Sequence, residues 1–258
     1  MNILFIGDIM GRTGRNSLFT YLYDLKDKLS VDFCIANCEN AAGGFGATAK
    51  HLDELIKAGV DAFTTGNHVY SKKEIIPLLN GNDYDIVRPY NLPKKDPGRG
   101  TMVCTAENGE KIAVINLLGR LFMGLPCDEP FAAADRALDE VRDRAKIILV
   151  DFHAEATSEK RAMGYYLDGK VSAVLGTHTH VQTADEMILP NGTAYITDVG
   201  MCGAKNFVLG AEIDTAIGKL TSSVTGRFEI AKGEQQFNAM FMKFNADGKC
   251  GEIKRIYL

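Results

Sequence analysis

Short apolar runs alternate with helical patterns along the first third of the chain. Residues 3–6 form a continuous apolar run, which is typical of a strand buried on both faces. Leucines at positions 18, 22, 25 and 29 recur at the spacing of one helix face. The same alternation predicts further strands at 33–36, 62–65 and 85–87, one helix between Thr48 and Gly59, and another over 72–80.

The stretch 88–130 has a different character. It begins with a segment rich in Pro, Lys, Gly and Asn, which predicts a loop. Two apolar segments, 102–106 and 111–118, then flank Asn108-Gly109, a dipeptide that strongly favours a tight β-hairpin. The stretch ends irregularly. It could therefore form a lid or a small local insertion.

Apolar strands return in the second half of the chain. They are predicted at 147–150, 171–175 and 194–197. From residue 226 to the C-terminus the pattern alternates around a turn at Gly248, which predicts antiparallel strands. Together these patterns indicate an α/β core with mixed sheets, and we expect a single domain over 1–258.

Composition and charge are those of an ordinary globular protein, with 46% hydrophobic and 24% charged residues. The formal net charge of −4 provides no basic surplus, so duplex nucleic acid is not expected as a partner. The chain has no run of 18 apolar residues. Its first residues are apolar, but no basic residue precedes them and Asp8 interrupts them. We therefore expect neither a membrane partner nor a signal peptide.

The six cysteines are irregularly spaced and include no C-x-x-C pair. In a chain without a predicted leader, this pattern indicates reduced, buried thiols and a cytoplasmic location.

Polar and ionisable side chains follow five of the predicted strands. These residues are Asp8, Glu39, Asn40, Asn67, His68, His153, His178 and His180. Because ligands bind at the carboxyl ends of strands in α/β sheets, we expect these side chains to converge on one edge. They include four of the five histidines of the chain, and only His51, on a predicted helix, lies outside the set.

Each of these residues alone has an ordinary structural explanation. Asp8 could cap a helix, Asn67 could belong to a turn, and a single histidine after a strand is usually structural. Convergence of all of them favours a functional site. Imidazole and carboxylate ligands suit Mn²⁺, Fe²⁺ or Zn²⁺. The donors are too many for one four-coordinate ion, so they predict two ions that share a bridging carboxylate, a clamp suited to hydrolysis at phosphorus.

The order of these residues resembles that of the calcineurin-like metallophosphoesterases. That family usually opens with Asp-x-His, whereas Asp8-Ile9-Met10 lacks the histidine. Its second motif is usually Gly-Asp-x-x-Asp, whereas Glu39-Asn40 stands in that place here.

Both departures match one subfamily, the YmdB-like bacterial phosphodiesterases. The segments Asn-Cys-Glu-Asn-Ala-Ala-Gly-Gly at 37–44 and Thr-Gly-Asn-His at 65–68 are similar to that subgroup. The resemblance extends from residue 1 to about residue 206. It implies a four-layer α/β/β/α sandwich built on two mixed sheets.

The resemblance also implies a role for each residue of the set. Two divalent transition-metal ions would be bound, with Fe or Mn preferred and Zn as the alternative. The first ion would be held by Asp8, Glu39, Asn40 and His180, and the second by Asn67, His153 and His178. Glu39 would bridge the two ions. His68 would act as catalytic residue by protonating the leaving oxygen, because an alkoxide leaves far more easily once protonated.

The implied reaction is hydrolysis of a P–O ester bond by in-line attack of a metal-bound hydroxide. The implied substrates are small phosphodiesters, in particular cyclic nucleotides such as 2′,3′-cAMP. The spacing of His178 and His180 fits an extended segment, because alternate residues of such a segment share one face. The sequence assigns no substrate-binding residue.

Two other functions stay open. The same metal site could serve a phosphomonoesterase or a phosphoprotein phosphatase. Alternatively, metal could stabilise a regulatory or scaffold protein whose catalysis is incidental. A zinc amidohydrolase fits poorly, because those enzymes carry His-x-His on their first strand. A homo-oligomer is also compatible with the sequence.

Weaker candidates lie nearby in the sequence. The glycine-rich segment 43–46 could approach a phosphate, although a simple turn explains it equally well. Arg12 and Arg15 could contact substrate or merely face solvent. Segments 88–91 and 122–123 could offer an aromatic ring for stacking on a base, and core packing is the alternative for the second.

Overall fold

Parallel strands and a C-terminal antiparallel hairpin form the first sheet in the computed structural model, which describes residues 1–222 and 229–258. The strand order is β14-β13-β1-β3-β4, and β1, β3 and β4 run parallel. The strands are β1 (Asn2–Ile6), β3 (Phe33–Asn37), β4 (Ala62–Thr64), β13 (Asn238–Phe244) and β14 (Cys250–Tyr257). Both faces of β1 are buried, because Ile3 and Phe5 contact the second sheet while Leu4 and Ile6 contact helices.

The second sheet has the order β5-β6-β7-β8-β10-β9. Strands β6, β7, β8 and β10 run parallel, and β5 and β9 are antiparallel edges. The bounds are β5 (Thr101–Thr105), β6 (Lys111–Leu118), β7 (Ile147–His153), β8 (Ala173–Thr177), β9 (Met187–Ile188) and β10 (Ala194–Ile196). Each sheet therefore mixes parallel and antiparallel pairs.

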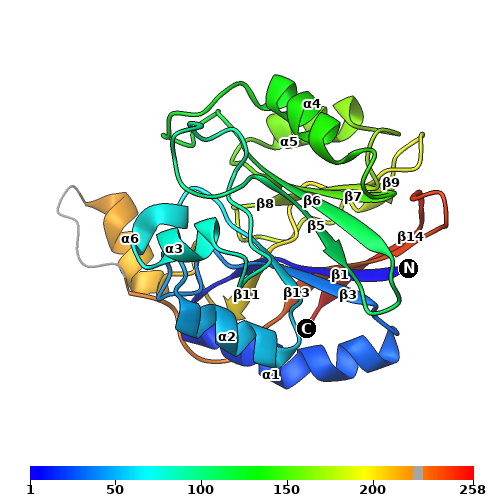
Figure 1. Ribbon diagram of the computed structural model, residues 1–258. Helices are drawn as coiled ribbons and strands as arrows, with labels where there is room; N and C mark the ends of the chain where they lie inside the picture. The colour runs from blue at the N-terminus through cyan, green and yellow to red at the C-terminus, as the bar shows by residue number, and fades with distance from the viewer. Residues whose placement is uncertain (223–228) are drawn as a thin grey trace.

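Helices cover the outer face of each sheet (Figure 1). On the first sheet lie α1 (Gly11–Lys28) and α2 (Ala49–Ala58), and on the second lie α4 (Pro130–Val141) and α5 (Thr157–Tyr166). Three apolar clusters separate these layers, one under each helical layer and one between the sheets. The predicted four-layer α/β/β/α sandwich is therefore confirmed.

A third, smaller sheet was not predicted. It has the order β12-β11-β2 and joins β12 (Gln235–Gln236), β11 (Met201–Ala204) and β2 (Asp8–Ile9). In it Asp8 pairs with Met201, so the main chain that carries this carboxylate is held by a neighbouring strand.

The remaining elements correct some boundaries. The expected helix over 72–80 begins later, as α3 (Ile75–Asn80), after a 3₁₀ turn over Val69–Ser71. The strand expected at 85–87 is only an isolated bridge between Phe63 and Ile86. The last helix, α6, spans Ile213–Thr221. The start of the antiparallel tail, 226–228, lies outside the described residues.

The stretch 88–130 is partly integral to the sheet. The predicted hairpin around Asn108-Gly109 is present as β5 and β6. The loop before it is tied together by Arg88, whose guanidinium donates to the carbonyl oxygens of Pro89 and Tyr90. A lid role for the loops on either side of this hairpin stays a prediction.

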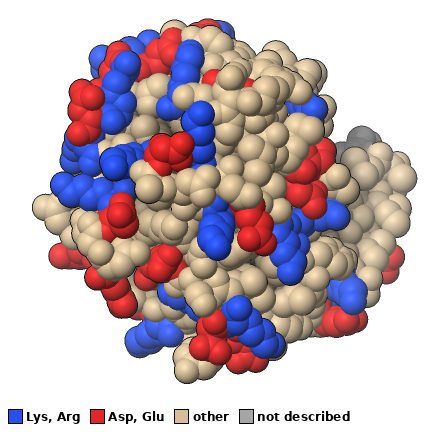
Figure 2. All heavy atoms as spheres, turned by 90° about the vertical axis from the view of Figure 1, so that its right-hand side faces the viewer, with Lys and Arg blue, Asp and Glu red and all other residues tan. Residues whose placement is uncertain are grey.

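Charged side chains of both signs are interspersed on the face shown in Figure 2. A mixed surface of this kind creates no strong field of one sign over that face. Among the described residues, no helix combines the length and the apolar character needed to cross a membrane.

Candidate metal centre

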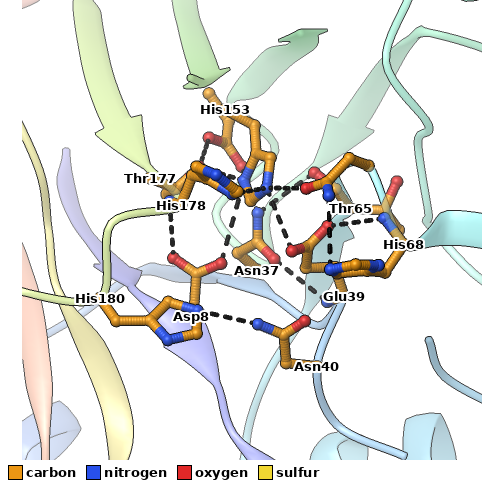
Figure 3. A network of polar contacts seen from close by, with 12 residues as sticks. Asp8, Asn37, Glu39, Asn40, Thr65, His68, His153, Thr177, His178 and His180 are labelled. Carbon is orange, nitrogen blue, oxygen red and sulfur yellow. Dashed lines mark hydrogen bonds and ion pairs between the residues drawn. The ribbon is translucent and has the colours of Figure 1, made fainter. Parts of the chain in front are cut away.

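All eight predicted site residues meet in one cluster, in which Figure 3 labels every one except Asn67. They come from the ends of β1, β3, β4, β7 and β8, as the rule for α/β sheets predicts. Asp8, Glu39, Asn40, His153 and His180 are buried, and Asn67, His68 and His178 are partly buried. Residues that lie far apart in the sequence thus form one polar cluster inside a mostly apolar fold.

The ring of His153 is the centre of the cluster. Its Nε2 atom lies 3.1 Å from Glu39 Oε1, 2.9 Å from Asn67 Oδ1 and 3.1 Å from His178 Nδ1. Oxygen and nitrogen atoms of four side chains thus converge on one small region. Glu39, His153 and His178 each offer a ligand atom, and these atoms lie within 4.8 Å of one another.

The second half of the cluster joins Asp8, Asn40 and His180. The Asn40 amide lies 2.9 Å from His180 Nε2. Asp8 Oδ2 accepts a hydrogen bond of 3.1 Å from the backbone N–H of His178. Asp8 Oδ1 is buried without a hydrogen-bond partner among the described residues. Since such an unpaired atom is costly, a bound cation explains it well, and the donor set fits divalent metal.

The pKa values of the cluster show how strongly it attracts positive charge. Burial alone would raise the pKa of Glu39, but His153 and His68 outweigh this effect and bring it to about 2. Burial alone would lower the pKa of His153, yet Glu39 and Asp8 raise it to about 9. Burial and the charge of His153 lower the pKa of His178 to about 3. Glu39 is thus ionised, and His178 is a neutral ring able to donate a lone pair.

The turn after β8 differs from the expected extended segment, so that prediction is wrong. His178 and His180 have φ values of 100° and 65°, in the left-handed region. Such a conformation costs on the order of 1–3 kcal/mol per residue and occurs where the surroundings impose it. Here it directs His178 towards His153 and His180 towards Asn40, so the two rings still reach different halves of the cluster.

Gly66 allows the end of β4 to approach the cluster closely. A Cβ atom at this position would overlap Glu39 Oε2 and the ring of His153. The absence of a side chain therefore lets Asn67 and His68 reach the site. His68 lies beside the cluster, where its backbone N–H donates to Glu39 Oε2 at 3.1 Å.

A second layer of hydrogen bonds orients the His153 ring of the cluster. Thr177 Oγ1 lies 2.8 Å from His153 Nδ1 and donates to Asp151 Oδ1 at 2.6 Å. Asn37 Nδ2 donates to the other carboxylate oxygen of Asp151 at 3.0 Å. Because His153 Nδ1 is engaged in this way, its Nε2 faces the cluster.

Sequence reasoning missed two carboxylates near the site. Glu155 Oε2 lies 3.2 Å from His178 Nε2, an arrangement that leaves Nδ1 to face His153. No sequence signal marks Glu155, which lies in a loop. Asp198 accepts from the backbone N–H of Thr179 and so supports the turn that carries both histidines. Asp198 directly follows the 194–197 segment, so the strand-end rule could have found it.

The weaker candidates mostly lie elsewhere. Arg15 forms an ion pair of 2.6 Å with Glu54, and Arg12 is exposed. Tyr90 donates to Glu140 at 2.7 Å, and the Phe122 side chain is 85% exposed. Only the glycine-rich segment 43–46 borders the site, where Gly44 and Phe45 line a cavity of about 200 Å³ that opens onto the cluster.

Comparison with known proteins agrees with this arrangement. A model of YmdB-like proteins matches residues 4–256. The chain belongs to the YmdB-like family. The match covers nearly the whole chain, so it includes every residue of the cluster.

Several relatives align with the whole of this chain. The chain is 46% identical to a 2′,3′-cyclic-nucleotide 2′-phosphodiesterase of Bacillus subtilis, over 100% of this chain and 97% of the relative. A crystal structure of a hypothetical protein from Thermus thermophilus shares 41% identity, with a TM-score of 0.93 and coverage of 100% and 99%. A crystal structure described as a novel phosphatase of Mycoplasma pneumoniae shares 35% identity, with a TM-score of 0.93 and coverage of 100% and 93%.

These findings confirm the predicted family, the metallophosphoesterase-type fold and the enzyme class, a phosphodiesterase. They also agree with a candidate metal-binding group of histidine and glutamate.

Proposed function

We propose that this YmdB-like protein is a dinuclear metal-dependent phosphodiesterase that hydrolyses nucleoside 2′,3′-cyclic phosphates. The convergence of lone pairs around His153 Nε2, next to the unpaired Asp8 Oδ1, carries the metal-dependent part. The 46% identity to an enzyme named for this substrate supports the choice of substrate.

The two halves of the cluster correspond to two metal sites that share one carboxylate. One site would comprise Asp8, Glu39, Asn40 and His180, and the other Glu39, Asn67, His153 and His178. Imidazole, carboxylate and amide donors without thiolate suit Mn²⁺ or Fe²⁺, with Zn²⁺ as the alternative. When bound, such ions would neutralise phosphoryl oxygens and lower the pKa of a water molecule.

His68 is placed to handle the proton of the leaving oxygen. It lines the cavity beside the cluster, and its backbone is fixed by the bond to Glu39. Its Nε2 lies 3.3 Å from the Asn67 amide, so the ring points back towards the metal-binding residues. A histidine in this position can donate a proton to an alkoxide as the P–O bond breaks.

His68→Ala tests this assignment. We expect the variant to keep its bound metal and to lose about 10²- to 10⁴-fold in kcat, the usual contribution of a general acid. Conversion of 2′,3′-cAMP to a nucleoside monophosphate is followed by phosphorus NMR, and metal content is measured on the same samples.

His51→Ala is the matched control for this substitution. His51 lies on α2, where its ring contacts Thr48 at 2.8 Å, outside the cluster. The His51→Ala variant should hydrolyse 2′,3′-cAMP with the kcat of the wild type. Unchanged turnover in His68→Ala would contradict the proton-donor role.

A phosphomonoesterase with the same metal centre is the second candidate, because the Mycoplasma relative is described as a phosphatase. Comparison of p-nitrophenyl phosphate with bis(p-nitrophenyl) phosphate separates the two activities. A higher kcat/KM for the monoester would favour this second candidate. Bound metal without turnover of either ester would favour the scaffold alternative.

A further inference from the structure

The cavity beside the candidate metal centre has a mixed lining. Its polar lining residues are Glu39, Asn40, His68, Glu155, His178 and His180. Its other lining residues are Met10, Gly44, Phe45 and Leu209. The volume of about 200 Å³ is below the range of roughly 300–1,000 Å³ for whole-ligand pockets. The cavity thus suits one part of a substrate whose phosphate lies at the metals.

Phe45 is held rigidly against the site. Its ring centroid lies 4.8 Å from that of His68, and the two ring planes are nearly perpendicular. On either side of it, the backbone N–H of Gly44 donates to the carbonyl oxygen of Asn40 at 3.0 Å, and that of Gly46 donates to the carbonyl of Glu39. Phe45 is nevertheless 38% exposed, and it lines the cavity.

Leu209, another lining residue of the cavity, has an unusual backbone conformation. Val208 and Ala211 exchange backbone hydrogen bonds of 3.1 and 2.9 Å around Leu209 and Gly210. Both central residues have positive φ, 51° for Leu209 and 79° for Gly210. Asn or Gly is the ordinary choice for such a turn, and a leucine there is strained. This turn brings the backbone of Leu209 against the ring of His180, and Leu209 itself is 61% exposed and lines the cavity.

We propose that Phe45 and Leu209 form the nucleobase subsite of this enzyme. The inference rests on the proposed function and deepens it, because it assigns the part of the substrate that the metals do not contact. Base stacking on an aromatic ring tolerates every base, since each has a π-face. The subsite therefore favours nucleotides over other phosphodiesters without selecting one base.

The position of His68 supports this assignment. In a 2′,3′-cyclic nucleotide, O2′ and the base are carried by adjacent carbons of the ribose. These two groups lie on opposite faces of the ribose but on neighbouring carbons, so a ring beside the proton donor is within reach of the base. Among the described residues, the Phe45 ring lies beside His68. The other aromatic candidates are elsewhere, because Tyr90 is bonded to Glu140 and Phe122 does not line the cavity.

With His68 as the proton donor to O2′, the bond that breaks is P–O2′. Water adds its oxygen to phosphorus, the P–O2′ bond breaks, and O2′ takes up a proton from His68. The second proton of the reaction comes from the water and restores His68. The product is the nucleoside 3′-monophosphate, and no oxidant or reductant is involved.

Two substrates with the same reacting group test the subsite. One is 2′,3′-cAMP, and the other is the 2,3-cyclic phosphate of 1-O-methyl-ribofuranose, which has no base. We expect Phe45→Ala to raise KM for 2′,3′-cAMP about tenfold or more while kcat changes little. KM for the base-free substrate should stay the same. Leu209→Asn should raise KM for 2′,3′-cAMP in the same selective way.

Phe122→Ala is the matched control, because it removes an exposed ring that does not line the cavity. It should leave both substrates unaffected. An equal effect of Phe45→Ala on both substrates would mean that Phe45 only positions His68, and would overturn the inference. No effect on either substrate would overturn it as well.

Failure of the proposed function gives a different result. If wild-type protein with Mn²⁺ hydrolyses neither substrate, both the proposed function and the nucleobase subsite are wrong. If it hydrolyses both with the same KM, the phosphodiesterase stands and only the nucleobase subsite is overturned.

Discussion

Glu39→Gln is expected to remove most of the bound metal and to lower kcat for 2′,3′-cAMP by on the order of 10³-fold or more. The glutamine keeps the shape of the side chain but removes the negative charge. In the proposed function Glu39 would be shared by the two metal sites. Its Oε1 lies 3.1 Å from His153 Nε2, and Asn40 follows it directly in the chain. Its low pKa, set by His153 and His68 against the effect of burial, shows that it is charged.

Metal content per chain and kcat are measured together on this variant. Glu110→Gln is the matched control, because Glu110 is exposed in the turn of the β5–β6 hairpin. The control should retain both metal and activity. If Glu39→Gln kept wild-type metal content and kcat, the shared-carboxylate arrangement would be wrong.

Lys160→Met is expected to destabilise the fold by about 3–5 kcal/mol, the usual cost of leaving a buried charge without its partner. Lys160 Nζ lies 2.6 Å from Asp198 Oδ2, and the side chains are 1% and 0% exposed. Asp198 also accepts hydrogen bonds from the backbone and hydroxyl of Thr179, and from the backbone N–H of Gly200. Losing the lysine thus affects the turn that carries His178 and His180.

The midpoint of urea unfolding measures this effect. Lys170→Met is the matched control, because Lys170 is 45% exposed and 3.8 Å from Asp135, and such a surface pair contributes about 0–1 kcal/mol. Equal midpoints for Lys160→Met and wild type would refute the role given to the buried pair.

The same pair gives a pH signature. Burial would raise the pKa of Asp198, but Lys160 and the hydrogen bonds lower it below its ordinary value. The contribution of Asp198 to the free energy of unfolding is therefore fully present above the pKa of about 3.9 that the residue has in the unfolded chain. It is lost as the pH falls through the lower pKa that Asp198 has in the folded protein. The difference in stability between wild type and Lys160→Met should accordingly shrink in that acidic range.

Much of this architecture was predictable, because short apolar runs and strand-end polar residues are strong local signals. Residues 3–6 indicated a strand buried on both faces, and Ile3 and Leu4 indeed contact different layers. Asp8, Glu39 and His153 were grouped only by their place after a strand, and the structure brings them together. The predictions of a cytoplasmic location and of a homo-oligomer stay predictions.

The missed features depend on tertiary contacts. Histidine occurs at positive φ more often than most residues, but the sequence does not show that His178 and His180 adopt this conformation, because the surrounding groups impose it. Strand β2 exists because β11, far along the chain, pairs with it. Glu155 reaches His178 from a loop. Phe45 was passed over in favour of Tyr90 and Phe122, because a sequence does not show which loop borders the cavity.

The central claim is that this cluster hydrolyses phosphodiesters only with divalent metal bound, and a metal titration tests it most directly. The protein is stripped with chelator and dialysed, and Mn²⁺ is added back while hydrolysis of 2′,3′-cAMP is followed. The account predicts no turnover in stripped protein and a rise that levels off at about two equivalents of metal per chain. Full turnover in stripped protein, or none at any level of Mn²⁺ or Fe²⁺, would contradict it.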